Sequence, residues 1–288
     1  MTPDEFFGRR SLFVGIESQH WNREQIISAA LRSRALGYDT LVLKVADGGE
    51  RWYDTTADLL ALHNDVNAVG AGLAFYQYCY GPLFGEQQIR AEAAIANEIR
   101  SISDFPILDM EIEWNNNPAA ATQFMDLLQG NHSFVVSTWA DPVQQQWMGV
   151  VDALWNSGKV AEFWPQEYNK FLEYTGGRQF PEPLERRYII PTYAAGWDAL
   201  PQYFIYDRVS IWEYSLPAPL LKKWAQIPLR PPVATNIAAA PSLQSLANEQ
   251  HISISELRAL HSDALARLAA QYSLPSWPDT ATLPPNFP

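Results

Sequence analysis

The sequence has little cysteine, little basic charge and no long apolar run, and each shortage excludes a class of protein. Its single cysteine, Cys79, excludes an intramolecular disulfide and a metal site built from several cysteines. The residues around Cys79, FYQYCYG, favour a packed side chain rather than a nucleophile. The net charge of −12 argues against nucleic acid as a partner, because phosphate contacts need concentrated Lys and Arg. Without an apolar run of about eighteen residues, no membrane span is expected.

Several functional signatures are missing as well. The opening segment, MTPDEFFGRRSLFVGIES, has no apolar stretch of about 7–15 residues behind a basic start, so no secretory signal peptide is expected. This leaves a protein released by lysis, one carried on a phage-type particle, or otherwise a cytoplasmic one. The five histidines follow no metal-ligand spacing, so we expect neither a metal nor another cofactor. No G-x-S-x-G motif occurs either.

Short β-rich runs recur along the 288 residues, and segments with helical periodicity separate them. The runs are Leu12–Ile16, Thr40–Val45, Gly72–Tyr78, Phe105–Glu111, Phe134–Thr138, Val160–Trp164, Tyr188–Tyr193 and Val209–Tyr214. Alternating strands and helices predict an α/β fold with a mostly parallel sheet, and eight such units indicate a TIM-like (β/α) barrel. A doubly wound open sheet fits less well, because no Gly-rich phosphate loop follows the first strand.

The barrel pattern ends close to residue 226. Residues 227–241 are rich in proline and have no periodicity, which predicts a semi-rigid linker. Residues 242–288 return to a helical pattern and predict a small α-rich domain. We therefore expect a barrel over residues 1–226, followed by the linker and this second domain.

The stretch FPILDMEIEWNNN leads three acidic residues out of an apolar strand. Asp109 and Glu111 are two positions apart, so in a strand they point to the same face, whereas Glu113 is expected beyond the strand end. Barrel enzymes keep their active sites at this end of the strands. Two shielded carboxyl groups there would leave one protonated and one ionised, as in glycosidases. The alternative is that the acids cap a turn or pair with surface arginines.

The other strand ends bring acidic and aromatic residues to the same rim. Glu17, His20 and Trp21 follow the first strand, and a lone histidine such as His20 is more often structural than catalytic. Aromatic rings with polar edges can cover the apolar faces of sugars while bonding their hydroxyls. The residues expected to bind substrate are Tyr76, Tyr78, Trp139, Trp164, Trp212, Glu213 and Trp21.

Taken in order, these motifs resemble those of the family 25 glycoside hydrolases, the muramidases that cut peptidoglycan between N-acetylmuramic acid and N-acetylglucosamine. The chain has GIESQHW where the family has GID-S-W, TLVLKVADG for FVIIKATEG, AFYQYCYG for GAYHF, LDMEIE for LDVE and IWEYS for WQY. The resemblance covers roughly residues 11–215. It implies an irregular barrel, Glu111 as the catalytic acid and Asp109 as the carboxylate beside it, with the substrate's acetamido group as a possible nucleophile.

The chain departs from the family pattern at two positions. Glu17 replaces the aspartate of the first strand, and one extra methylene would displace a positioned carboxylate. The aspartate that often follows WQY has no counterpart in EYSLPAPLLKKW. With Glu17 taken as a third catalytic residue, we expect a peptidoglycan-cleaving muramidase. A catalytically silent glycan-binding or assembly component of a phage or injection particle, and a cytosolic enzyme on some other sugar, remain the alternatives.

The C-terminal segment SLQSLANEQHISISELRALH resembles the first part of a LysM module, a small unit that binds peptidoglycan and chitin. A DNA-binding helix-turn-helix shares this pattern. Residues 230–288 hold three Arg, no Lys and four acidic residues, so their net charge is 3 − 4 = −1, which is poor for phosphate contacts. The resemblance therefore implies a wall-binding module at 242–288. The expected partner is peptidoglycan or a related amino-sugar glycan, bound by a monomer.

Overall fold

A computed structural model describes residues 1–139, 148–166, 188–191, 208–212, 214–215, 217–226 and 228–229. The predicted module at 242–288 and nearly all of the predicted linker at 227–241 lie outside these residues. For the strand residues Trp139, Pro165 and 188–191, the description covers the backbone alone. No helix among the described residues is long and apolar enough to cross a bilayer.

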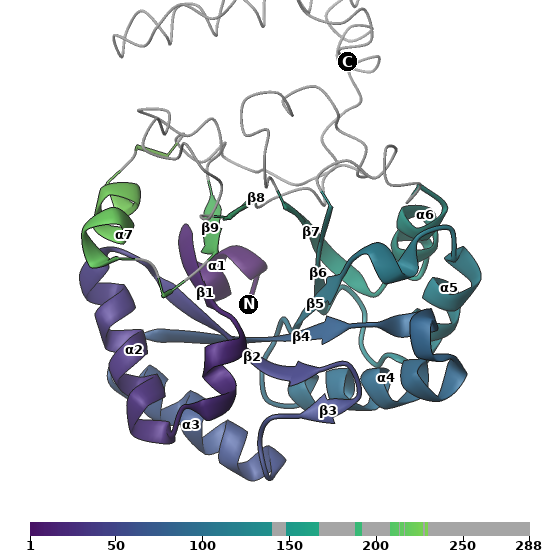
Figure 1. Ribbon diagram of the computed structural model, residues 1–288, viewed down its shortest axis with the longest axis horizontal. Helices are drawn as coiled ribbons and strands as arrows, with labels where there is room; N and C mark the ends of the chain where they lie inside the picture. Colours follow the sequence, from purple (N-terminus) through teal and green to yellow (C-terminus); the bar gives the residue numbers. More distant parts are fainter. Residues whose placement is uncertain are drawn as a thin grey trace, which may run out of the picture. The chain divides into compact units, whose positions relative to one another are not determined.

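Eight parallel strands close into a ring around which the fold is built (Figure 1). They are β1 (Arg10–Val14), β2 (Thr40–Asp47), β4 (Gly72–Cys79), β5 (Ile107–Met110), β6 (Phe134–Trp139), β7 (Val160–Gln166), β8 (Tyr188–Pro191) and β9 (Val209–Trp212). Each pairs with the next in this order, and β9 pairs with β1 to complete the ring. The predicted TIM-like (β/α) barrel is confirmed, and all eight predicted strands occur.

Helices surround the strands and begin and end where the sequence signals them (Figure 1). They are α2 (Arg23–Leu36), α3 (Thr56–Ala68), α4 (Glu86–Arg100), α5 (Pro118–Leu127), α6 (Met148–Asn156) and α7 (Ala218–Ala225). Asn22 and Gln25 form a capping box at the start of α2, with side chain to backbone bonds of 3.0 and 2.8 Å. Gly37 ends α2 in the left-handed conformation, which glycine adopts without steric cost.

Three short 3-10 turns leave the carboxyl ends of strands and carry most of the candidate site. They are η1 (Ile16–His20) after β1, η2 (Gly81–Phe84) after β4 and η3 (Ile112–Trp114) after β5. The strand β5 ends at Met110, one residue earlier than predicted, so Glu111 is the residue that caps η3. A two-residue strand, β3 (Glu50–Arg51), folds back antiparallel on β2 and was not predicted.

Alternate strand residues divide the core into an inner and an outer layer. The interior of the barrel is filled by a cluster that includes Phe13, Val42, Tyr76 and Trp164. Strand residues of the other parity face outward and pack under the helices in three further clusters. The interior is therefore a packed core rather than a pore, so a site has room only at the ends of the strands.

A short N-terminal helix, α1 (Pro3–Phe7), packs its last residue into the barrel core and was not predicted. The Phe7 side chain is fully buried and packs edge-on against Trp164, with ring centroids 4.6 Å apart. Arg208, before β9, bonds Glu162 of β7 at 3.2 Å and pairs with Asp4 of α1. These contacts attach α1 to the strands by a buried aromatic pair and by an ion pair between Asp4, which is partly exposed, and the buried Arg208.

Replacing Phe7 by alanine should destabilise the barrel by about 3–5 kcal/mol, because it leaves a cavity against Trp164 where the core cannot collapse. Urea unfolding followed by near-ultraviolet circular dichroism measures the loss. The matched control is Leu60→Ala on α3, since that side chain is 43% exposed and should cost little. Equal midpoints for the two variants would show that α1 does not contribute to the core.

Candidate active site

Asp109 is a buried carboxyl group at the carboxyl end of β5. Its side chain points into the barrel and the residue is 6% exposed. Asp109 Oδ1 accepts hydrogen bonds from Ser137 Oγ of β6 at 2.9 Å and from Gln166 Nε2 of β7 at 2.8 Å. Gln166 Nε2 also lies 2.9 Å from Ser137 Oγ. Three consecutive strands therefore hold this carboxyl group in one position.

Glu111 is half-buried just beyond Asp109 and forms a coupled pair with it. Burial raises the pKa of Asp109 well above its usual range, and the charge of Glu111 raises it further. Burial also raises the pKa of Glu111, although a hydrogen bond from Gln166 opposes the shift. Because the groups interact, they titrate as a pair. The pair holds a proton to higher pH than two exposed carboxyl groups would.

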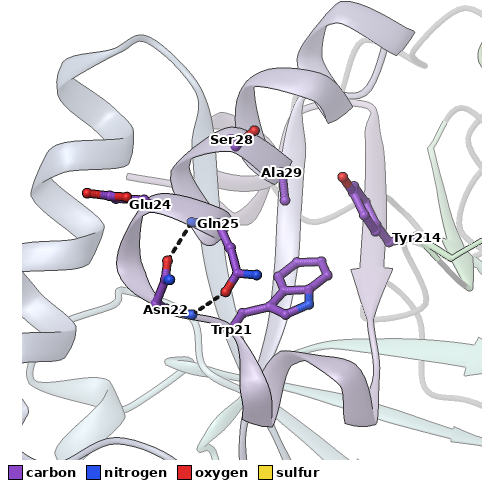
Figure 2. A pocket seen from close by; sticks show the side chains of 7 residues that line it. All are labelled: Trp21, Asn22, Glu24, Gln25, Ser28, Ala29 and Tyr214. Atoms are coloured by element: carbon purple, nitrogen blue, oxygen red, sulfur yellow. Dashed lines mark hydrogen bonds between the residues drawn. The ribbon is translucent and has the colours of Figure 1, made fainter.

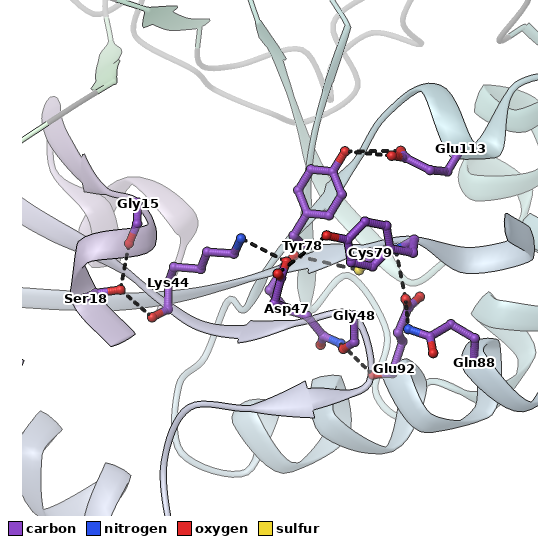
Figure 3. A network of polar contacts seen from close by, with 12 residues as sticks. Gly15, Ser18, Lys44, Asp47, Gly48, Tyr78, Cys79, Gln88, Glu92 and Glu113 are labelled. Carbon is purple, nitrogen blue, oxygen red and sulfur yellow. Dashed lines mark hydrogen bonds and ion pairs between the residues drawn. The ribbon is translucent and has the colours of Figure 1, made fainter. Parts of the chain in front are cut away.

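Lys44 of β2 brings a positive charge to this group of acids. Its ammonium lowers the pKa of both Asp109 and Glu111. Lys44 Nζ lies 2.9 Å from Asp47 Oδ1 and 5.3 Å from the centre of the Tyr78 ring (Figure 3). This cation partly offsets the charge that accumulates when the carboxyl groups ionise.

Tyr78 of β4 links the strand ends to η3. Its hydroxyl donates to Glu113, at 3.0 and 3.2 Å from the two carboxylate oxygens (Figure 3). Burial and the charges of Glu111 and Glu113 raise the pKa of Tyr78, so the phenol stays protonated and remains a donor. Glu113, which the strand pattern placed beyond the pair, is therefore half-buried and bonded to the wall of the site.

Glu92 of α4 is a fully buried carboxyl group beneath the turn between β4 and η2, and the sequence patterns did not single it out. It accepts hydrogen bonds from the backbone N–H groups of Tyr80 at 2.8 Å and Gly81 at 3.0 and 3.1 Å, and from Gln88 Nε2 at 2.8 Å. Burial raises its pKa from 4.5 to about 7. The available signal was an acidic residue on the apolar face of α4, between Ile89 and Ala96.

The first-strand candidate Glu17 lies in η1, the turn that follows β1. It is half-buried, and a Cβ added at Gly15 would come within 3.7 Å of its carboxylate and 3.1 Å of the Trp212 ring. Trp212 packs inward against Phe13, with ring centroids 5.7 Å apart. Glu17 and Trp212 are therefore neighbours, and a side chain at Gly15 would require the Trp212 ring to shift slightly.

Two residues expected to bind substrate fill the barrel core instead. Tyr76 is 1% exposed and lies between Phe13 and Trp212, while Trp164 is fully buried and its Nε1 donates to Glu162 at 2.9 Å. Both point inward, as their strand positions predict, but they lie too deep in the barrel to form its rim. In this structure both residues therefore belong to the packed core, and their contact with substrate stays a prediction.

Trp21 contributes to a separate hollow of about 460 Å³ against α2 (Figure 2). Its ring packs edge-on against Tyr214 at 5.2 Å, and both side chains pack against the core layer outside the strands. The other residues that line the hollow are Asn22, Glu24, Gln25, Ser28 and Ala29. Trp21 therefore does not belong to the group around Asp109.

The remaining predicted residues fall into three groups. The side chain of Trp139 and the whole of Glu213 lie outside the described residues. His20 is exposed in η1. Cys79 is fully buried, and burial raises the pKa of its thiol, which confirms it as a packed residue. No three or more His, Cys, Asp or Glu side chains within the described ranges are arranged to hold a metal ion.

No family model matches the sequence, and no curated protein matches it either. Among solved structures, the chain is similar to a β-mannanase from Streptomyces thermolilacinus with mannohexaose, at 14% identity and a TM-score of 0.48, over 73% of this chain and 80% of that one. It is also similar to an aldolase from Thermotoga maritima, at 11% identity and a TM-score of 0.43, over 85% of this chain and 70% of that one. A third similar structure is an endolysin catalytic domain from bacteriophage P40 of Listeria monocytogenes, at 14% identity and a TM-score of 0.32, over 56% of this chain and 74% of that one. At these scores we draw nothing about chemistry from the likeness.

Glu92 should make the stability of the protein depend on pH. Its folded pKa lies above its unfolded value of 4.5, so its contribution to the free energy of unfolding falls as pH rises from about 4.5 through about 7. The full loss above that range is about 3 kcal/mol. Glu92→Gln keeps an acceptor for the backbone donors and should remove this part of the pH dependence.

Urea unfolding between about pH 5 and 8 gives the free energy of unfolding of the parent and of Glu92→Gln. The difference between the two proteins isolates Glu92, because the contributions of the other titrating groups cancel. The control is Glu92→Ala, which leaves three hydrogen-bond donors without an acceptor and should destabilise the protein at every pH by about 2–4 kcal/mol. A constant difference between parent and Glu92→Gln across this range would contradict the raised pKa.

Proposed function

We propose that this protein is a glycoside hydrolase of the muramidase type that cleaves peptidoglycan by carboxyl acid catalysis. The observation that carries the proposal is the coupled pair Asp109 and Glu111 at the end of a barrel strand, with both pKa values raised by burial. A general acid that protonates a leaving oxygen near neutral pH needs such a raised pKa. The Tyr78 ring beside the pair can cover the apolar face of a sugar.

The geometry supports a division of roles within the pair. Glu111 is the more exposed member and stands above Asp109, so it is placed to donate its proton to the glycosidic oxygen as the C1–O bond breaks. In the free protein the strongly raised pKa of Asp109 places the pair's proton on Asp109, so the mechanism requires this proton to move to Glu111 when substrate binds. The carbonyl oxygen of the substrate's 2-acetamido group would then attack C1, and ionised Asp109 would stabilise the positive charge that develops on this group. Glu111, now ionised, would then take a proton from the water that attacks C1.

The family resemblance supports the same assignment, since LDMEIE supplies both residues in the order that family 25 glycoside hydrolases use. Together with the LysM-like pattern at 242–288, it supports peptidoglycan or a related amino-sugar glycan as the partner, and two modules on one polymer gain avidity. Because peptidoglycan lies outside the cytoplasm, this function requires release by lysis, carriage on a particle or another route out. We propose that the protein acts as a monomer.

A catalytically silent glycan-binding or assembly component is the second candidate. The departures at Glu17 and after Trp212 favour it, because both fall on residues that the family pattern uses near its site. Glu17 lies beside the ring of Trp212, the last residue of the strand that the second departure follows. In this case the pair would be retained without turnover.

Replacing Glu111 by glutamine should abolish cleavage, because the amide cannot donate the acid proton. The rate should fall by about 10²–10⁴-fold. The assay incubates purified protein with peptidoglycan and identifies the released fragments and their new reducing ends by mass spectrometry. Reducing-end N-acetylmuramic acid from the parent and none from Glu111→Gln supports the muramidase.

Glu50→Gln on exposed β3 is the matched control and should cleave as the parent does. If the parent binds sacculi but releases nothing from walls of several compositions, the silent binding component replaces the enzyme.

Removing the charge of Lys44 should move the pH profile of cleavage upward. The ammonium lowers the pKa of Asp109 and Glu111, so both values rise in Lys44→Met. Both limbs of the kcat/KM profile should then move to higher pH, whereas Lys44→Arg keeps the charge and should leave them in place. Rates on a soluble peptidoglycan fragment across about pH 4–9 give the profiles. A downward shift in Lys44→Met would contradict this electrostatic role.

A further inference from the structure

A row of aromatic rings leads away from the acid pair toward the surface. Tyr78, bonded to Glu113, packs against Tyr80 with ring centroids 4.9 Å apart, and Tyr80 packs against Phe84 of η2 at 5.6 Å. Phe84 is 64% exposed, although a phenylalanine gains stability from burial. Packing in the core therefore explains the inner end of the row but not its outer end.

The turn that carries this row is held in place from below. The carboxyl group of Glu92 accepts hydrogen bonds from the backbone N–H groups of Tyr80 and Gly81. Gly81 has a φ of +52°, and a Cβ there would lie 2.1 Å from the Trp114 ring. Trp114 Nε1 in turn donates to the carbonyl oxygen of Cys79 at 2.7 Å. A fully buried acid and a buried tryptophan thus fix the direction in which η2 leaves the barrel.

The same network connects the row to the acids. Tyr80 donates from its hydroxyl to Asp47 Oδ2 at 3.4 Å, and Asp47 pairs with Lys44. The backbone N–H of Gly48 donates to the carbonyl oxygen of Tyr78 at 2.8 Å. Asp47, Lys44 and Gly48 therefore connect the two tyrosines of the row to the charged groups around the acid pair. Preorganised surfaces of this kind bind with little loss of conformational freedom.

We propose that Tyr80 and Phe84 form a glycan subsite in which sugar units next to the cleaved bond stack on the aromatic row. This proposal rests on the proposed function and extends it from the acid pair to chain length. Pyranose rings present apolar C–H faces that stack on aromatic rings, while the two tyrosine hydroxyls give the row a polar edge. A polymer bound at the pair would extend along the row and cover Phe84.

The position of the row favours a glycan over a protein partner. It is continuous with the carboxyl groups through Tyr78, so a ligand that reaches the acids lies beside it. A protein docked on Phe84 would have no need of the buried network that orients the row toward the acids. The subsite therefore predicts that affinity depends on the length of the sugar chain.

The test measures glycan binding without turnover, in the Glu111→Gln background. Isothermal titration with soluble, peptide-free N-acetylglucosamine–N-acetylmuramic acid chains of four and eight units gives the affinities. Phe84→Ala should weaken binding of the longer chain about tenfold and leave the shorter chain within about twofold. Leu83→Ala is the matched control, because Leu83 is 58% exposed on the same turn but is not part of the row, and it should change neither affinity.

Each outcome separates the subsite from the proposed function. Equal affinity of the Glu111→Gln protein, with and without Phe84→Ala, for the long chain overturns the subsite. Cleavage of peptidoglycan by the protein with Glu111 intact would still stand in that case. A parent that binds neither chain overturns both. Equal losses in Phe84→Ala and Leu83→Ala would indicate a general apolar surface and would also overturn the subsite. Far-ultraviolet circular dichroism of each variant confirms that it is folded.

Discussion

Closure of the parallel ring, through the pairing of β1 with both β2 and β9, is the constraint on which the site depends. It turns every strand so that alternate side chains meet inside and all carboxyl ends reach one rim. Asp109 of β5 is in register with Ser137 of β6, and Gln166 of β7 reaches the same oxygen. These side chains are far apart in the sequence, and the closed ring holds them in contact.

Closure also accounts for the unusual electrostatics. A packed interior excludes water, so a carboxyl group at the mouth loses solvation and its pKa rises. Asp109 and Glu111 show this shift at the mouth, and Glu92 shows it where α4 packs beneath the turn after β4. Their burial would be costly without partners, and Asp109 and Glu92 each accept bonds from at least two donors. Perturbed pKa values cluster at functional sites, which makes the strand-end pair a candidate for one.

The strands and the acid pair could be predicted from the sequence, because both follow local sequence patterns. Apolar runs between helical segments predicted all eight strands, and an i, i+2 spacing put Asp109 and Glu111 on one rim. Depth within the barrel has no local signal, which is why Trp164 was expected at the rim rather than in the core. The sequence also carried no signal for the irregularity in the pairing of β2 with β4, where the register shifts between Lys44 and Ala46. Three residues apart in a regular strand, Lys44 and Asp47 would face opposite sides, and the irregularity brings them to one face.

The partners described for the pair bear on the two departures from the muramidase pattern. Asp109 accepts hydrogen bonds from side chains of β6 and β7, and the Lys44 ammonium of β2 lowers the pKa of both Asp109 and Glu111. Glu17 stands beside Trp212, where the ring closes between β1 and β9. Burial, neighbouring carboxylates, hydrogen bonds from Ser137 and Gln166, and the Lys44 ammonium shift the pKa values of the pair. The side chains that bond Asp109 therefore come from β6 and β7, and not from the two positions at which the chain departs from the family pattern.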